Sequence, residues 1–292
     1  MRERQKIVAA IHDLSGFGRC ALSVILPTIS AMGIQCVPVP TAVLSTHTGG
    51  FEGYILNDLT DHIPACLDHY RSLGIVFDAV YTGFLASEEQ ADGCLGFFRA
   101  FPSAMKVVDP VLGDHGAAYR TCTEGLIRRM IELARRADVI TPNPTEAALL
   151  LGEEYREVYT EAALGETLRR LSELTPAVAL TGVTLDEGSY LNAAIERGSG
   201  AIRLFRLKKL PVLYPGTGDL FASVLTGGLL RGEGLFSAAD RASAFCSRAI
   251  AVTMGNGAPP RNGVEFERVL GFLAGGVSGE EKEGEDDQTC DL

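Results

Sequence analysis

Residues 215–219, Pro-Gly-Thr-Gly-Asp, come directly before a run of apolar residues that recur at helical spacing, from Leu220 to Leu229. This spacing predicts a buried helix that begins close to Gly218. The first turn of a helix leaves backbone N–H groups without helical partners, and glycines let an anion approach them closely. The stretch therefore indicates a cradle for an oxyanion or a phosphate.

Asp219 has two interpretations at this point. As an acid in the first helical turn it complements the helix dipole, which is worth about 0.3–1 kcal/mol. A negative charge beside a bound phosphate is repelled, however, unless the acid has a task of its own, such as accepting a proton. A helix N-terminus is expected to keep this carboxyl ionised near neutral pH. The other polar residues of the chain must decide between the two.

Polar and aromatic residues follow three predicted strands in the first third of the chain. Asp13 comes after the first strand, His47 and Thr48 lie in the loop after the second, and Phe84 follows the third. Ligands of open parallel sheets bind at the carboxyl ends of the strands. Asp13 is placed to bind a polar substrate group, and Phe84 either stacks on a planar ring or fills the core. The Ser45–Gly50 segment is either an ordered loop over a small ligand or a simple turn.

Carboxylates and an amide follow the next two strands. Asp109 ends one strand with Asp114 five residues later, and Asn143 and Glu146 follow the neighbouring strand across a proline-rich loop. Magnesium with a nucleoside triphosphate needs one or two acids, because water and phosphate oxygens fill its remaining positions. Each acid alone is more often a cap or a solvated loop residue. Three of them opposite an anion cradle predict a site for magnesium and a nucleotide.

The elements that must position these residues alternate between short apolar strands and helical patterns. Strands are expected at 6–11, 36–44, 79–82, 106–109, 139–141, 177–181, 189–194 and 202–207. Helices are expected at 20–32, 88–100, 123–137, 144–151, 161–174, from 218 onward, 237–253 and 264–273. The pattern predicts an α/β fold with a mostly parallel central sheet, helices on both faces and an edge hairpin.

The chain has 292 residues, of which 46% are hydrophobic, and this is enough for one substantial core over residues 1–274. The remainder, 275–292, contains seven acids against one lysine and has no apolar periodicity, so we expect a disordered acidic tail. The formal charge of −11 and the dispersed cations argue against nucleic acid as a partner and favour a small molecule.

Cysteine usage and the absence of long apolar runs predict a cytoplasmic protein. The seven cysteines are an odd number without a C-x-x-C pair, which is typical of reduced thiols rather than a disulfide scaffold or a zinc site. No eighteen apolar residues run together, and the N-terminus has no signal-peptide core, so no membrane partner is expected.

Several other enzyme classes fail on their motifs. Gly16-x-Gly18-x-x-Ala21 matches a dinucleotide fingerprint, but no acid for the ribose occurs between Leu14 and Phe51, which ranks a nicotinamide dehydrogenase last. The chain also has no P-loop, no protein-kinase motif set and no Gly-x-Ser-x-Gly nucleophile elbow.

Taken together, these motifs resemble the ribokinase-like superfamily of small-molecule kinases, in particular its pyridoxal kinases. The resemblance rests on Gly216-Thr-Gly-Asp219, Asp109-Pro-Val-Leu-Gly-Asp114, Thr141-Pro-Asn-x-x-Glu146, His47-Thr-Gly49 and Thr82-Gly83, in that family's usual order, and it covers about residues 6–272. It implies a three-layer sandwich and ATP-dependent phosphorylation of a B6 vitamer, which feeds salvage to pyridoxal 5′-phosphate. It also implies a homodimer.

The resemblance further implies a role for each candidate residue. Asp219 would be the base, and Gly216, Thr217 and Gly218 would form the anion hole. Asp109 and Glu146 would hold magnesium, while Asp114, Asn143 and Thr181 would lie near the nucleotide phosphates or a potassium ion. The remaining four residues would surround the pyridine ring: Asp13, His47, Thr48 and Phe84.

The chain departs from the pyridoxal kinase pattern at two positions. The first loop, His12-Asp-Leu-Ser-Gly16, is more similar to hydroxymethylpyrimidine kinases, and Phe84 stands where a tyrosine is common. Hydroxymethylpyrimidine kinase therefore remains as an alternative, since its substrate carries the same hydroxymethyl group. A non-catalytic sensor of a vitamer or nucleotide is a more remote alternative, because Asp219 and the metal acids are all present.

Overall fold

The computed structural model describes residues 4–208 and 214–274. The expected acidic tail, 275–292, lies outside the described residues. None of the helices in the described ranges is long and apolar enough to cross a membrane.

A nine-stranded sheet forms the middle layer, in the order β11-β10-β9-β8-β5-β4-β1-β2-β3. Its strands are β1 (Ile7–Phe17), β2 (Gln35–Thr46), β3 (Leu56–Asp58), β4 (Ala79–Thr82), β5 (Met105–Val108), β8 (Val139–Ile140), β9 (Ala177–Thr184), β10 (Tyr190–Glu196) and β11 (Ile202–Leu207). Strands β9, β8, β5, β4, β1 and β2 are parallel, whereas β3 at one edge and β10 and β11 at the other run antiparallel to their neighbours. The parallel strands therefore all have their carboxyl ends on the same side of the molecule.

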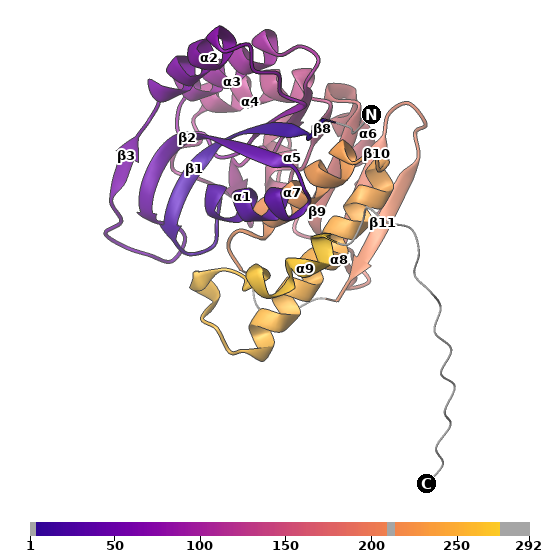
Figure 1. The fold of residues 1–292 in the computed structure, drawn as a ribbon. Helices are drawn as coiled ribbons and strands as arrows, with labels where there is room; N and C mark the ends of the chain where they lie inside the picture. The colour runs from indigo at the N-terminus through magenta and orange to yellow at the C-terminus, as the bar shows by residue number, and fades with distance from the viewer. Residues whose placement is uncertain (1–3, 209–213, 275–292) are drawn as a thin grey trace, which may run out of the picture.

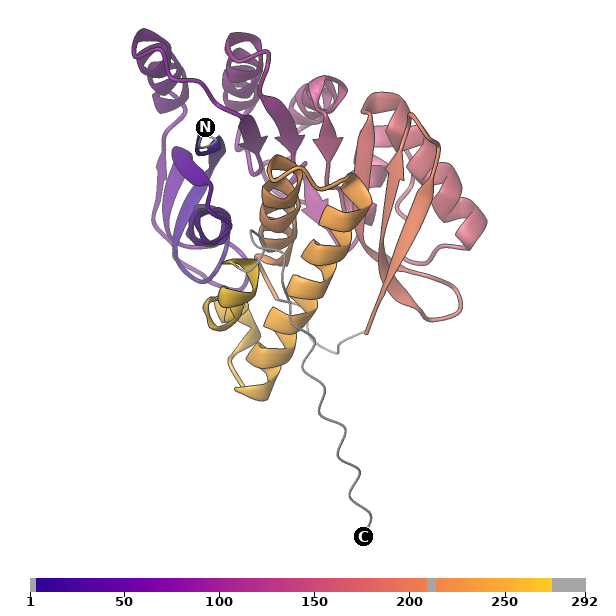
Figure 2. The ribbon, with the colours of Figure 1, turned by 45° about the vertical axis from the view of Figure 1, so that its right-hand side comes forward.

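Helices cover both faces of this sheet (Figures 1 and 2). One face packs on α2 (His62–Ser72), α3 (Glu88–Ala100), α4 (Glu124–Arg136), α5 (Pro144–Leu151) and α6 (Glu161–Leu174). The other packs on α1 (Leu22–Ala31), α7 (Thr217–Leu230), α8 (Leu235–Gly255) and the short α9 (Gly271–Ala274). The two faces thus bury separate apolar clusters, and the expected three-layer α/β sandwich is confirmed.

The first strand is longer than the sequence pattern predicts. β1 continues through the Ser-Gly-Phe segment to Phe17, because β2 pairs with it along this whole length, with a register irregularity between His12 and Leu14. Asp13 therefore lies within a strand rather than in the expected loop. Pairing between strands distant in sequence has overruled the local turn signal of the glycines.

Some short or weakly amphipathic parts of the chain differ from the expected elements. The prediction had no α2, of which only Ile63 is buried, no β3, and no small hairpin of β6 (Gly113–Asp114) and β7 (Ala117–Ala118). The helix expected over 264–273 was wrong: the chain forms a 3-10 turn at Phe266–Val269 and then α9. Short elements carry too few periodic positions for a pattern to identify them.

Candidate active site

Backbone hydrogen bonds tie the carboxyl ends of the central strands into one row. The N–H of Asp109 donates to Thr82 O at 2.8 Å, that of Thr141 to Val108 O at 3.1 Å, and that of Thr181 to Pro142 O at 2.9 Å. The ends of β4, β5 and β8 and the middle of β9 are thereby brought together from distant parts of the sequence. The row contains Asp109 and Thr181, two of the residues expected at the site.

The N-terminus of α7 faces this row. Gly216 is the N-cap residue in a left-handed conformation, with φ of 79°, and the first helical hydrogen bond is donated by Leu220 N to Gly216 O at 3.0 Å. The N–H groups of Thr217, Gly218 and Asp219 precede that bond and point out of the helix end. A Cβ placed on Gly218 would lie 4.0 Å from Asp109 Oδ2. The helix terminus and the Asp109 carboxylate therefore face each other across a short gap.

Asp219 lies in the first turn of α7 and is held from the opposite side of the site. Its Oδ2 accepts a hydrogen bond from the backbone N–H of Ala21 at 2.8 Å. Ala21 is the N-cap residue of α1 and has an unusual φ of 53° for a residue with a side chain. Strained backbone of this kind persists only where the surroundings fix it. The contact joins the N-termini of α1 and α7 and fixes one oxygen of Asp219.

Burial gives the carboxyl groups of the site raised pKa values. For Asp219, burial and then the charge of Asp109 raise the pKa to about 8, and the Ala21 N–H opposes this only in part. Burial raises the pKa of Asp109 to about 7 against the hydrogen bond from Thr141, and it raises the pKa of Asp13 against the hydrogen bond from Ser15. The expectation that the helix terminus keeps Asp219 ionised was therefore wrong for the protein alone, because burial and a neighbouring carboxylate outweigh the helix dipole.

Glu146 and Asn143 clamp the start of α5 as a capping box. Asn143 Oδ1 accepts from the N–H groups of Thr145 and Glu146, while Glu146 Oε2 accepts from Asn143 N at 2.8 Å. The Asn143 side-chain amide also donates to Gly113 O at 2.8 Å, and Glu146 Oε1 accepts from Leu112 N at 3.4 Å. Burial and the charge of Asp109 raise the pKa of Glu146 well above its usual value.

The charge balance of this group of acids favours a cation. The charged neighbours that raise the pKa values of Glu146 and Asp219 are other acids, and no described lysine or arginine is among them. The described residues contain no group of three or more His, Cys, Asp or Glu side chains arranged to hold a metal. Asp109 and Glu146 are the two acids that the sequence predicts as metal ligands, and two carboxylates suit an ion that keeps water and phosphate ligands.

His47 is buried and uses both ring nitrogens within the protein. The N–H of Gly49 donates to Nδ1 at 3.1 Å, so the proton lies on Nε2, which donates to Arg261 O at 2.7 Å. The ring packs edge-on against Phe51 at 4.9 Å. A substrate would thus meet the carbon atoms of His47, while Thr48 beside it is exposed.

The other expected site residues lie on different strands. Asp13 is buried and accepts from Ser15 Oγ at 2.8 Å, and Phe84 is half-buried directly after β4. Asp114 is half-exposed in the small hairpin, whose turn residue Gly116 donates to Thr145 Oγ1 at 2.9 Å. Thr181 Oγ1 lies 3.5 Å from Pro142 O. Within the described ranges, no hydrogen bond or ion pair joins these four side chains to one another.

Two residues at the site did not emerge from the sequence. Ala21 acts through its backbone, for which no side-chain pattern exists. Tyr81 is fully buried, and burial followed by the charges of Asp109 and Asp219 raises the pKa of its hydroxyl. A tyrosine in an apolar strand is predicted to be a core residue, and the Tyr81 ring is indeed buried in the core.

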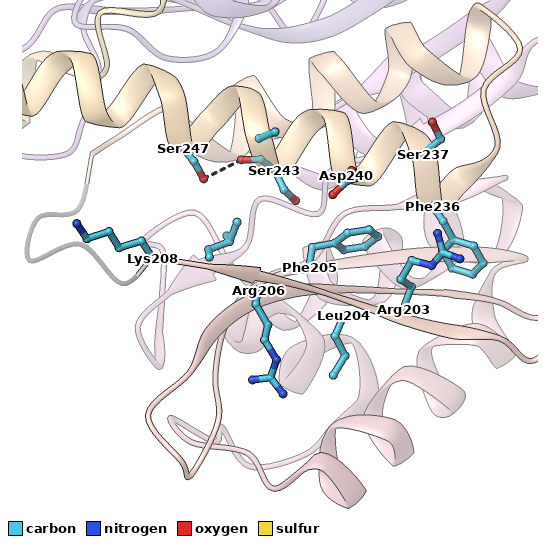
Figure 3. A pocket seen from close by; sticks show the side chains of 12 residues that line it. Arg203, Leu204, Phe205, Arg206, Lys208, Phe236, Ser237, Asp240, Ser243 and Ser247 are labelled. Carbon is cyan, nitrogen blue, oxygen red and sulfur yellow. Dashed lines mark hydrogen bonds between the residues drawn. The ribbon is translucent and has the colours of Figure 1, made fainter. Parts of the chain in front are cut away.

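A groove of about 610 Å³ runs between β11 and α8, away from the candidate residues. In Figure 3, Phe205 points toward α8, with Asp240 and Ser243 above it, whereas Leu204 and Arg206 point to the other side of β11. None of the expected catalytic or metal residues lines this groove. We do not assign the reaction to this groove, because its lining residues include neither the predicted metal carboxylates nor the N-terminus of α7.

Comparisons with known proteins identify the family of this chain. Residues 25–262 match the family model described as phosphomethylpyrimidine kinase. The chain belongs to this family. It is accordingly a small-molecule kinase with the ribokinase-like fold, as expected.

Relatives within and around the family carry two different names. The chain is 31% identical over 269 residues to the pyridoxine/pyridoxal/pyridoxamine kinase of Bordetella avium, which covers 84% of this chain and 85% of that protein. A crystal structure from Bacteroides thetaiotaomicron, described as a phosphomethylpyrimidine kinase and containing pyridoxal, is 41% identical with a TM-score of 0.88 over 92% of this chain and 96% of its own. Pyridoxal kinase from Lactobacillus plantarum is 30% identical, with a TM-score of 0.86 over 92% and 97%.

Proposed function

We propose that this kinase transfers the γ-phosphoryl group of ATP to the 5′-hydroxymethyl group of a B6 vitamer, that is pyridoxal, pyridoxine or pyridoxamine. The observation that carries this proposal is the placement of Asp219 in the first turn of α7, facing Asp109 and beside free backbone N–H groups. Pyridoxal in the structure of a 41% identical relative supports the choice of acceptor.

Asp219 accepts the proton of the acceptor hydroxyl. Because the Ala21 N–H holds Oδ2, the other oxygen, Oδ1, serves the substrate. A general base must be within hydrogen-bond reach of the proton it removes, and a fixed carboxylate satisfies this with little loss of freedom. The N–H groups of Gly216, Thr217 and Gly218 then stabilise the negative charge that spreads over the transferred phosphoryl group.

Asp109 and Glu146 are the residues that would hold magnesium, mostly through water, since both are buried oxygen donors that pair with no lysine or arginine of the described ranges. When bound, this ion would neutralise phosphate charge. Its positive charge would also favour the ionised form of Asp219. In this proposal Asn143, Asp114 and Thr181 lie on the nucleotide side of the site. A potassium ion would bind near Asp114 and Thr181.

The acceptor ring lies between Asp13, His47, Thr48 and Phe84 in this proposal. The buried Asp13 faces a polar substituent of the ring, and the half-buried Phe84 offers an aromatic surface after β4. His47 and Thr48 close the site as part of the loop fixed by Arg261 O. Hydroxymethylpyrimidine kinase is not favoured as the activity, because the relatives with 30% identity or more include two B6 vitamer kinases and a structure with pyridoxal.

Product formation from a panel of acceptors tests the proposal directly. The protein is incubated with Mg-ATP and, separately, with pyridoxal, pyridoxine, pyridoxamine or hydroxymethylpyrimidine, and the phosphorylated product is identified by mass. We expect phosphorylation of at least one vitamer with a kcat/KM at least tenfold above that for the pyrimidine. Preference for the pyrimidine would reverse the assignment, and binding without any turnover would support a sensor.

Removal of one metal carboxylate should weaken the response to magnesium. In Asp109→Ala or Glu146→Ala, one charge is lost from the shared shell of metal and water, and we expect the half-saturating magnesium concentration at fixed ATP to rise about 10–100-fold. Rate is measured against magnesium concentration for both variants.

The matched control for the magnesium series is Glu166→Ala, which removes an exposed acid of α6 that pairs with Arg169 at 3.3 Å. Its magnesium curve should overlay that of the unmodified protein. If the Asp109 and Glu146 variants also overlay it, the metal assignment fails.

We also propose a homodimer, as the family resemblance implies, and a cytoplasmic location. Phe17, Ile55 and Leu56 expose apolar surface where β1 and β2 end and β3 begins, and this is a candidate contact. The six described cysteines are all free, which fits a reducing compartment. Light scattering of the protein and of Ile55→Glu would test the dimer, whose mass should halve in the variant.

A further inference from the structure

A β-bulge lies at Thr181, on the nucleotide side of the site. β9 and β10 pair Leu180 with Ala193 and Val183 with Leu191, so that Thr181 and Gly182 together oppose the single residue Asn192. Gly182 has a φ of 70°, in the left-handed region. Bulges next to active sites re-aim a side chain, and the extra residue leaves a backbone group that the ladder does not pair.

The side chain of Asn192 supplies the missing partner. Asn192 is buried, and its Oδ1 accepts a hydrogen bond from Gly182 N at 3.0 Å. Its Nδ2 donates to Oγ of Ser243, a buried residue of α8, at 2.9 Å. The Gly182 N–H fixes the orientation of the amide, because a flipped amide would bring two donors together. One amide thus joins the bulge to the helix that covers it.

The bulge in turn connects to the loop that carries the metal and phosphate residues. Thr181, next to Gly182, donates its N–H to Pro142 O at 2.9 Å. Pro142 directly precedes Asn143, whose side chain caps α5 and orders Glu146. A shift of the bulge would therefore move Thr181 and the 141–146 loop together.

We propose that Asn192 is a positioning residue for the nucleotide: it holds the Gly182 bulge in its left-handed form and so sets the place of Thr181 and the loop after β8. This inference rests on the proposed function, which puts Thr181 and Asn143 at the nucleotide phosphates. Asn192 touches neither ligand in this proposal, and the acceptor side does not depend on it.

The test compares Asn192→Ala with the unmodified protein in two measurements. Asn192→Ala leaves Gly182 N without its partner, so we expect the KM for ATP and the Kd for Mg-ADP to rise about three- to tenfold, the effect of one lost hydrogen bond. The KM for the vitamer and the kcat should change less than twofold. Gly182→Ala disturbs the same bulge by another route, since φ of 70° strains any side chain, and should produce the same selective rise.

The matched control is Thr175→Ala, which removes a buried hydrogen bond to Ala137 O at 3.0 Å near the amino end of β9. It should lower the melting temperature to a similar extent without changing either nucleotide constant. Asn192→Ala with unchanged nucleotide constants, or with KM values raised equally for both substrates, would overturn the inference.

The direct Kd for Mg-ADP separates this inference from the proposed function. If the protein phosphorylates no vitamer, the proposed acceptor is wrong, but a selective loss of ADP affinity in Asn192→Ala still supports the positioning role. If vitamers are phosphorylated and the nucleotide constants of the variant do not change, only the positioning role fails.

Discussion

Asp219→Asn should lower turnover about 10²–10⁴-fold, the usual contribution of a positioned general base, while the affinities for vitamer and Mg-ATP stay within a few-fold. Asparagine keeps the size of the side chain, and its Oδ1 can still accept the hydrogen bond from the Ala21 N–H. It cannot take the proton of the substrate hydroxyl. Steady-state kinetics and calorimetric binding on the same preparation measure the two effects.

An acid with a purely structural role would give the opposite pattern. A first-turn carboxylate that only complements the helix dipole contributes at most about 1 kcal/mol, so its loss would lower stability slightly and leave turnover within a few-fold. Asp138→Asn is the matched control. Asp138 also accepts a backbone hydrogen bond, from Lys106 N at 2.7 Å, but it directly precedes β8, at the end of the strand away from the site. Near-normal turnover in folded Asp219→Asn would refute the mechanism.

Gly216→Ala should lower kcat/KM about 10²–10³-fold, comparable to the loss of one donor from an oxyanion hole. A Cβ at this position would overlap the backbone carbonyl oxygen of Arg19, and φ of 79° is unfavourable for alanine. The helix terminus must move away from Arg19, which displaces the N–H groups from the phosphoryl group. Stability should fall as well, by more than the roughly 1–2 kcal/mol of left-handed strain alone.

Gly33→Ala separates the two contributions to this effect. Gly33 has nearly the same φ, 76°, but a Cβ there meets no atom within 4 Å. This control should show the strain in urea unfolding and retain normal kcat/KM. A Gly216→Ala protein that behaves like Gly33→Ala in both measurements would show that the close approach to Arg19 does not matter for the anion hole.

The sequence by itself determined the elements whose signals are local. α3, α5 and α6 begin and end where the apolar spacing and the caps predict, and α7 begins at Thr217, one residue before Gly218. Helical periodicity, capping residues and glycines act within a few residues of chain, so a single sequence records them. The order of strands and acids, together with the glycine–aspartate motif, also indicated a site for magnesium and a nucleotide and carried the resemblance to a kinase family.

Only the tertiary structure decided what depends on contacts between distant segments. Pairing with β2 extends β1 past Asp13, and the Ala21 N–H, 198 residues away in the chain, holds Asp219. The raised pKa of Asp219 comes from burial and from Asp109, neither of which its own helix reveals. In the sequence, Asn192 is a single polar residue within an apolar strand. Only the folded structure places it opposite Gly182, whose N–H donates to its side chain. Burial, charge–charge distances and bulge pairing arise only when the chain folds, because they join residues that no local spacing relates.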